Sequence, residues 1–279
     1  MPVVVPTTLA GVFEALTADP HAHLLAGGTD FMVEVNFGHR RPPGVIALRA
    51  VSELRSWRID GDQIILGSGL TYADLASGAI AERLPALAAA ARTVGSPQIR
   101  NAGTLGGNVA TASPAGDTLP VLVALDASID LASPAGLRTL GWAEFFVGVK
   151  KTARRPDEVV TAVRIPVIDS RQDYLKVGTR NAMVISVAGV CVCVDFTNRR
   201  VRCGLGSVGP VALRAPEAEG WVAEHIDWNA RAVPDPRTYE TFGSMVGAAA
   251  RPIDDHRSTA EYRRHAVGVL AQRALMRLV

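Results

Sequence analysis

The feature that most constrains the fold of this chain is the stretch of residues 95–117, which reads GSPQIRNAGTLGGNVATASPAGD. Gly, Ala, Ser, Thr and Asn dominate it, and Arg100 is its only formal charge before Asp117. We predict a loop here, and a loop of this length without secondary structure is uncommon in a compact domain unless it has a function. The stretch is therefore the first candidate for a ligand site.

Residues 100–117 carry a high density of small hydrogen-bonding groups. We expect three kinds of donor, namely backbone N–H groups at Gly103, Gly106 and Gly107, hydroxyls at Thr104, Thr111 and Ser113, and the amide of Asn108. Many neutral donors suit a diphosphate, and Asp117 has a carboxylate that can accept hydrogen bonds from ribose hydroxyls. The alternative is a structural loop, whose glycines allow close contacts and whose Asn and Ser cap helices. The density of polar groups favours the ligand.

A second glycine-rich segment, LLAGGTDF, occupies residues 24–31 at the end of a predicted strand. Gly27 and Gly28 let the backbone turn sharply and approach a ligand without an obstructing Cβ. Successive N–H groups in such a turn form a concave anion site, to which Thr29 adds a hydroxyl. The alternative is an ordinary turn after a strand.

Neither segment is a P-loop or a Rossmann fingerprint, because no GxxxxGK[ST] is present and no GxGxxG joins a strand to a helix. A nucleotide would therefore bind by another architecture. Two glycine-rich segments far apart in the sequence favour an extended ligand such as FAD, spanning two subdomains, over a mononucleotide.

Hydrophobic periodicity predicts an α+β chain with a boundary near residues 166–173. Before the boundary we expect helices at 9–19, 71–79, 85–93 and 119–125, and strands at 23–27, 44–49, 62–67, 128–132, 136–140 and 158–165. After it we expect strands at 173–176, 184–196 and 201–208, and helices at 215–223 and 257–278. The alternation in VAGVCVCVD predicts a sheet with one covered face.

Composition excludes several classes of protein. The 29 basic and 27 acidic residues nearly balance, which gives no electrostatic footprint for nucleic acid. Three cysteines without zinc spacing predict reduced thiols and no metal site. The N-terminal residues lack the features of a secretory signal, and the longest apolar stretch, residues 181–194, is too short to span a membrane. We therefore expect a soluble, cytoplasmic protein.

The segments AGGTD (residues 26–30) and RNAGTLGGNVATASPAGD (residues 100–117) resemble the signature of the FAD-binding subunit of the xanthine dehydrogenase family, which also includes the medium subunit of carbon monoxide dehydrogenase. Residues 174–190 and 206–222 resemble the family's C-terminal domain. The resemblance implies a two-subdomain FAD-binding domain of the vanillyl-alcohol oxidase (PCMH) type, residues 1–168, divided into about 1–55 and 56–168. A small α/β domain with a three-stranded sheet and helices, residues 169–279, would follow.

The resemblance also implies which residues contact the cofactor. The first wall of the FAD site would consist of Leu24, Leu25, Ala26, Gly27, Gly28, Thr29, Asp30 and Phe31. The second would consist of Thr104, Gly106, Gly107, Asn108 and Thr111, with Asp117 at the nucleotide end and Val160 touching the cofactor. Lys176 would approach the flavin ring, where a cation stabilises the reduced anionic form. From the sequence alone, a solvated strand lysine is the better interpretation of Lys176.

The family's activity is a relay, which the resemblance carries to this chain. A large molybdopterin-binding subunit would hydroxylate the substrate, and a small [2Fe–2S] subunit would pass electrons to FAD on this chain. FAD would then reduce NAD⁺ or another acceptor, and no side chain here need be catalytic. Two alternatives stay open: a self-sufficient FAD-dependent oxidase or reductase, and a cofactor-free interaction protein.

Two positions depart from the family pattern. Relatives often have an acidic residue shortly after an Arg-x-Ala motif. In this chain the motif at residues 180–182 is followed by Met183, so a charge contact at this position is in doubt. Val94 stands where some relatives carry an aromatic side chain that stacks on adenine, so we expect weaker contact at this position.

Overall fold

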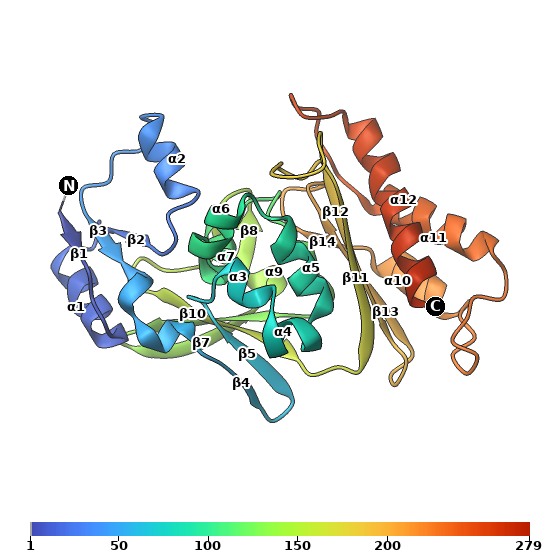
Figure 1. Ribbon diagram of the computed structural model, residues 1–279, viewed down its shortest axis with the longest axis horizontal. Helices are drawn as coiled ribbons and strands as arrows, with labels where there is room; N and C mark the ends of the chain where they lie inside the picture. Colours follow the sequence, from blue (N-terminus) through green and yellow to red (C-terminus); the bar gives the residue numbers. More distant parts are fainter. Residues whose placement is uncertain (1) are drawn as a thin grey trace.

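The computed structural model describes residues 2–279 and divides them among four β-sheets with helices between them (Figure 1). The first sheet is small and parallel, in the order β1-β3-β2, and α1 lies beside it. These elements are β1 (Val3–Val4), α1 (Leu9–Ala18), β2 (His23–Leu25) and β3 (Val45–Ala47). Thr8 caps α1 by accepting a hydrogen bond from the N–H of Gly11. The periodicity of residues 9–19 therefore predicted the helix correctly.

The second sheet is antiparallel and has the order β4-β5-β10-β6-β7. Its strands are β4 (Trp57–Asp60), β5 (Gln63–Gly67), β6 (Ser128–Ser133), β7 (Gly136–Gly141) and β10 (Val159–Pro166). The helices α3 (Tyr72–Leu75), α4 (Gly78–Arg83), α5 (Pro85–Thr93) and α8 (Leu119–Ala124) pack over it and form the main apolar core. We predicted one helix over 71–79, but the chain forms α3 and α4 instead, because Ser77 is extended and Gly78 has φ +60°, which interrupts the helix that the capping box at Thr71 begins.

Residues 95–117 are not the continuous loop that we predicted. They contain two short helices, α6 (Pro97–Ala102) and α7 (Leu105–Thr111). Ser96 and Thr104 begin them, each accepting a hydrogen bond from a backbone N–H of the first helical turn. Small polar residues that we interpreted as ligand donors therefore act in part as helix caps.

The C-terminal region forms a sheet in the order β11-β12-β13-β14. Its elements are β11 (Ser170–Val177), β12 (Ala188–Asp195), β13 (Arg200–Gly206), β14 (Leu213–Arg214), α10 (Pro216–Ala223), α11 (Arg237–Ala249) and α12 (Ala260–Leu278). The expected three-stranded sheet gains the two-residue β14 as a fourth strand. Helix α11 was not predicted, because Gly243 and Gly247 lower its helix propensity.

Strand β12 is buried on both faces, which corrects the prediction of one covered face. Its valines, Val190, Val192 and Val194, belong to the core beneath α11 and α12. Its cysteines, Cys191 and Cys193, belong to the core of the N-terminal region, beside α5 and α8. The sheet thus stands between two sets of helices (Figure 1). Because side chains alternate along a strand, the valines of β12 point into one core and its cysteines point into the other.

The remaining elements of the N-terminal region are short. They are α2 (Phe31–Asn36), the 3-10 turns Leu48–Ala50 and Ser52–Arg55, α9 (Trp142–Phe145), β8 (Phe146–Gly148) and β9 (Lys151–Thr152). In the chain from residue 2 onward, no helix combines the length and the apolar character that a membrane crossing requires.

Candidate functional site

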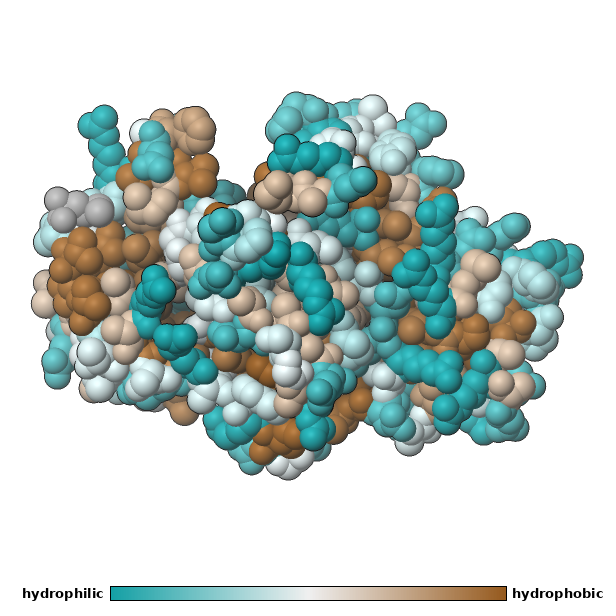
Figure 2. Space-filling view, viewed as in Figure 1, coloured by the Kyte–Doolittle hydropathy of each residue, from teal (hydrophilic) through white to brown (hydrophobic). Residues whose placement is uncertain are grey.

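A groove of about 620 Å³ lies where the first sheet, the helices α6 and α7 and the C-terminal region meet. Its volume lies within the usual range of small-molecule sites. Residues 22–31 line one side, and residues 104, 106–108, 110–111, 113 and 115–117 line the other. Figure 2 shows the surface hollowed between the lobe that carries α2 and the lobe that carries the loop before β12. The two glycine-rich segments therefore do meet around one cavity.

The first side of the groove is the turn that follows β2. Gly28 has φ +72°, a backbone conformation that glycine adopts without strain. The backbone N–H groups of Gly27, Gly28, Thr29 and Asp30 donate to no acceptor among residues 2–279. N–H groups without protein partners at the edge of a cavity suit an anion, as we expected from this segment.

Gly27 is needed for a contact inside the protein rather than for access of a ligand. A Cβ at Gly27 would lie 2.0 Å from the carbonyl oxygen of Ala102, at the end of α6. Gly106 is also packed against the protein, because its Cβ would lie 2.4 Å from Cβ of Ser68 and 2.8 Å from the carbonyl oxygen of Ser68. Gly27 thus lets the turn after β2 pack against α6, and Gly106 lets α7 pack against the end of β5, where we had assigned the glycines to the approach of a ligand.

On the second side, the backbone donors that we expected to face a ligand are already used. The N–H of Gly103 donates to Ile99 O at 2.7 Å, and the N–H of Gly106 donates to Ser68 O at 2.8 Å. The N–H of Gly107 donates to Oγ1 of Thr104 at 3.0 Å. The expectation of free N–H groups at Gly103, Gly106 and Gly107 was therefore wrong. At Asn108 the amide oxygen, rather than the amide donor group, is engaged, because it accepts a hydrogen bond from the Thr118 hydroxyl at 2.5 Å.

Asp117 and Lys176 form a buried ion pair, with Nζ 2.6 Å from Oδ2 and with only 7% of the Asp117 side chain and 8% of the Lys176 side chain exposed. Oδ1 of Asp117 also accepts hydrogen bonds from Ser186 at 2.6 Å and Tyr174 at 3.3 Å, and Oδ2 accepts one from Thr93 at 3.3 Å. Burial and the charge of Asp117 hold the pKa of Tyr174 well above its usual value, so the phenol remains a donor. The interpretation of Lys176 as a solvated lysine was wrong.

This network joins two regions of the chain. Asp117 precedes α8, whereas Tyr174, Lys176 and Ser186 belong to β11 and the loop before β12. Asp117 lines the groove, but Lys176 does not, because the lysine lies behind the carboxylate. Apart from Lys176, the residues that we assigned to the cofactor all lie along the groove, including the buried Val160 of β10.

Sequence reasoning missed the charged rim of the groove. The further charged residues that line it are Glu34, Arg40, Arg49, Arg55, Lys150 and Arg154. Lys150 Nζ lies 2.9 Å from Glu34 Oε1, and this hydrogen bond lowers the pKa of Glu34. The pair holds α2 against the turn between β8 and β9. No motif marks these positions, because the chain brings them together only on folding.

His23, in β2, is half-buried and lines the groove. Its ring stacks on Phe31 with centroids 4.1 Å apart. Burial, together with the charges of Arg40 and Arg154, lowers the pKa of His23 to about 4. The imidazole is therefore neutral near pH 7 and offers a flat surface beside the turn after β2.

The loop before β12 contributes Met183, Val184 and Ile185 to the groove. Met183 is 55% exposed and Ile185 is 60% exposed. This end of the groove is therefore apolar. Across residues 2–279, no group of three or more His, Cys, Asp or Glu side chains is placed to hold a metal ion.

Comparisons with known proteins agree over both regions of the chain. A sequence model described as "FAD binding domain in molybdopterin dehydrogenase" matches residues 1–168. A second model, described as "CO dehydrogenase flavoprotein C-terminal domain", matches residues 173–278.

Individual relatives match over nearly their full length. The xanthine dehydrogenase FAD-binding subunit of Escherichia coli O157:H7 is 28% identical over 98% of this chain and 94% of its own length. The carbon monoxide dehydrogenase medium chain of Hydrogenophaga pseudoflava is 30% identical over 91% of this chain and 88% of its own length. A solved structure of carbon monoxide dehydrogenase from the same organism, lacking the Mo-pyranopterin moiety of the molybdenum cofactor, is similar with a TM-score of 0.87. It is 27% identical and covers 100% of this chain and 96% of the solved one.

Proposed function

The chain belongs to the FAD-binding subunits of the molybdopterin dehydrogenase family, and on that premise we propose that it relays electrons within a larger molybdenum hydroxylase. It is an oxidoreductase subunit, and FAD is its cofactor. We propose that residues 1–168 form the FAD-binding domain, with subdomains at about 1–55 and 56–168, and that residues 169–279 form the C-terminal domain.

The observation that carries the proposed site is the set of unpartnered N–H groups at residues 27–30, facing a groove between the two glycine-rich segments. Backbone N–H groups without acceptors are costly unless water or a ligand satisfies them, and the FAD diphosphate offers negatively charged oxygens. The residues present therefore fit FAD. On this assignment the free donors lie mainly on the first side, and Thr111 adds a hydroxyl from the second.

The remaining residues would shape the groove around the cofactor. Leu24 to Phe31 would hold the diphosphate, and Thr104, Gly106, Gly107 and Asn108 would hold the opposite side in place through their internal hydrogen bonds. Asp117 would shape the nucleotide end from within the wall of the groove, because its two oxygens already accept hydrogen bonds from Lys176, Thr93, Tyr174 and Ser186. Val160 would pack against the cofactor.

When bound, FAD supplies the electron chemistry, so the chain needs no acid or base side chain. We propose that electrons come from [2Fe–2S] clusters on a small partner subunit and leave to NAD⁺ or another acceptor. A large partner subunit would carry the molybdopterin cofactor. The proposal is supported by relatives that are named medium chains and by one whose name includes the molybdenum cofactor. The free cysteines at 191, 193 and 203 suit a reducing cytoplasm.

Titration of the purified full chain with FAD tests the proposal. We expect the chain to take up FAD in equimolar amount, with the flavin absorbance spectrum of a bound cofactor. A colourless chain that binds no FAD would favour the cofactor-free interaction protein and contradict the proposed site.

Co-expression with the proposed partners tests the relay. We expect a large molybdopterin-binding and a small cysteine-rich chain to purify together with this one. We also expect the FAD-loaded chain alone to turn over no reducing substrate at a useful rate. An isolated chain that oxidises a substrate and reduces an acceptor by itself would instead support the self-sufficient oxidase or reductase.

Replacing Gly107 by valine tests the groove without forcing its sides apart. A Cβ at Gly107 would lie 3.0 Å from Oγ1 of Thr104 and 4.0 Å from Cβ of Ala26, so alanine should be tolerated once the Thr104 side chain shifts by a few tenths of an ångström. The branched side chain of Gly107→Val would extend into the groove. We expect FAD affinity to fall by about tenfold or more, about 1.4 kcal/mol, with Gly107→Ala close to wild type. Equal FAD affinity in Gly107→Val and wild type would place the cofactor elsewhere.

A further inference from the structure

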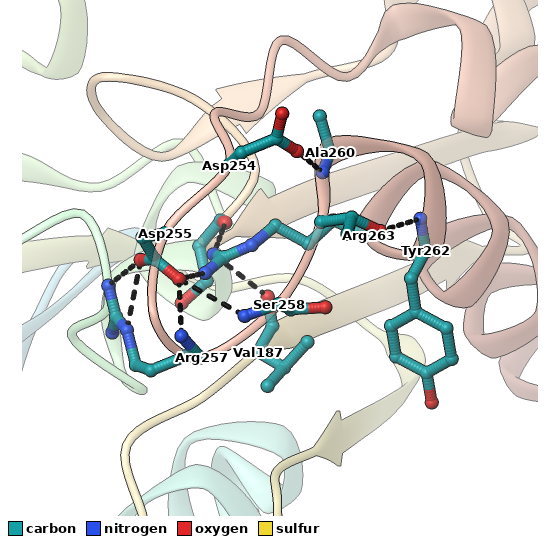
Figure 3. Close-up of polar contacts among 10 residues, drawn as sticks. Val187, Asp254, Asp255, Arg257, Ser258, Ala260, Tyr262 and Arg263 are labelled. Carbon is teal, nitrogen blue, oxygen red and sulfur yellow. Dashed lines mark hydrogen bonds and ion pairs between the residues drawn. The ribbon is translucent and has the colours of Figure 1, made fainter.

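Arg263, on α12, is 2% exposed and lies outside the groove, where its guanidinium group joins three separate segments (Figure 3). Nη2 donates to Asp255 Oδ1 at 2.7 Å. Nη1 donates to the carbonyl oxygen of Ser207 at 2.7 Å and to that of Val187 at 3.2 Å. Arg257 binds the other oxygen of Asp255 at 2.7 Å, so two arginines fix this carboxylate. The planar fork of an arginine can hold several acceptors in one arrangement.

Ser207 connects Arg263 to the second side of the groove. Its N–H donates to the carbonyl oxygen of Pro114 at 2.9 Å. Pro114 lies between Ser113 and Ala115, and both of these residues line the groove. Ser207 also has φ +63°, a conformation that a residue with a side chain adopts only when its surroundings hold it there. The hydrogen bond from Arg263 to the Ser207 carbonyl is one such restraint.

Val187 connects Arg263 to the loop before β12. The preceding residue, Ser186, donates to Asp117 Oδ1 at 2.6 Å. The three residues before it, at 183–185, line the groove. One guanidinium group therefore restrains two segments that line the groove. It restrains residues 113–117 through Ser207, and residues 183–186 through Val187.

We propose that Arg263 is a positioning residue for FAD, which fixes residues 113–117 and 183–186 from behind through Ser207 and Val187. This inference rests on the proposed function, because it concerns the same groove. Arg263 makes no contact with the cofactor. Its removal changes the geometry of the groove by releasing two backbone carbonyl oxygens and the strained Ser207 together.

Titration of FAD into full-length Arg263→Met and Arg263→Lys chains tests the inference. In Arg263→Met we expect the affinity for FAD to fall by about tenfold, and the visible circular dichroism of bound flavin to change. Arg263→Lys keeps the charge and one donor group, so we expect it to restore part of the affinity. Arg214→Met is the matched control, because it breaks the partly buried ion pairs that Arg214 forms with Glu219 and Asp126, away from the groove. We expect this control to lower thermal stability and leave FAD affinity and the flavin spectrum unchanged.

Amide hydrogen exchange of the FAD-free chains separates this inference from the proposed function. We expect segments 113–117 and 183–187 to exchange faster in Arg263→Lys than in wild type, and to be unaffected in Arg214→Met. If Arg263→Met does not fold, Asp255→Asn removes a carboxylate charge that orients the guanidinium and should show a smaller effect of the same kind. A wild-type chain that binds no FAD would overturn the proposed function, whereas the exchange of these segments would still test Arg263. Unchanged exchange, affinity and flavin spectrum in the Arg263 and Asp255 variants would overturn the inference.

Discussion

Gly27→Ala is expected to abolish useful FAD binding, because a Cβ at this position would lie 2.0 Å from the carbonyl oxygen of Ala102. Real Cβ atoms essentially never come within 3.0 Å of such an atom, so the turn after β2 must move away from α6 by about 1 Å. That movement displaces the unpartnered N–H groups of residues 27–30. We expect the affinity for FAD to fall by about a hundredfold, about 2.7 kcal/mol, measured by titration.

The matched control for Gly27→Ala is Gly220→Ala on α10. Nothing lies within 4 Å of a Cβ built at Gly220, and alanine favours a helix by about 1 kcal/mol over glycine. We expect this variant to bind FAD like wild type and to be slightly more stable. If Gly27→Ala also binds FAD with wild-type affinity, the close approach of the turn to α6 does not shape the cofactor site.

Lys176→Met is expected to destabilise the chain strongly, because it leaves Asp117 buried without its cation. Removing one partner of a buried ion pair typically costs about 3–5 kcal/mol. Three neutral donors, from Thr93, Tyr174 and Ser186, would remain on the carboxylate and should keep the loss near the lower end of that range. Urea unfolding of the FAD-free chain measures the free energy, and FAD titration measures the effect on the groove.

A double-mutant cycle shows whether the effect comes from the pair itself. We expect Asp117→Asn combined with Lys176→Met to be more stable than Lys176→Met alone, since the double variant buries no unpaired charge. Arg237→Met is the surface control, because Arg237 pairs with Asp235 while its side chain is 86% exposed. An exposed pair contributes about 0–1 kcal/mol. A Lys176→Met chain as stable as the Arg237→Met control would show that the buried pair does not hold the two regions together.

Much of the secondary structure was predictable because its signals are local. The spacing of apolar residues identified α1 and α12, and proline in the first turn identified α5. Caps were the exception. Ser96 and Thr104 start α6 and α7 within a stretch that we interpreted as a loop, since the same small polar residues serve both helix caps and ligand sites.

The sequence by itself determined the two glycine-rich segments, the order of most helices and strands, and a resemblance specific enough to indicate FAD. These properties lie in short runs of residues, where composition and spacing act locally. Only the tertiary structure decided that Gly27 faces Ala102, that the N–H of Gly106 is already used by Ser68, and that Lys176 lies behind Asp117. Each of these facts is a contact that depends on the tertiary fold. Asp117 and Lys176 are 59 positions apart, and no sequence pattern links them. The two charged groups form an ion pair because packing of the two regions buries them side by side.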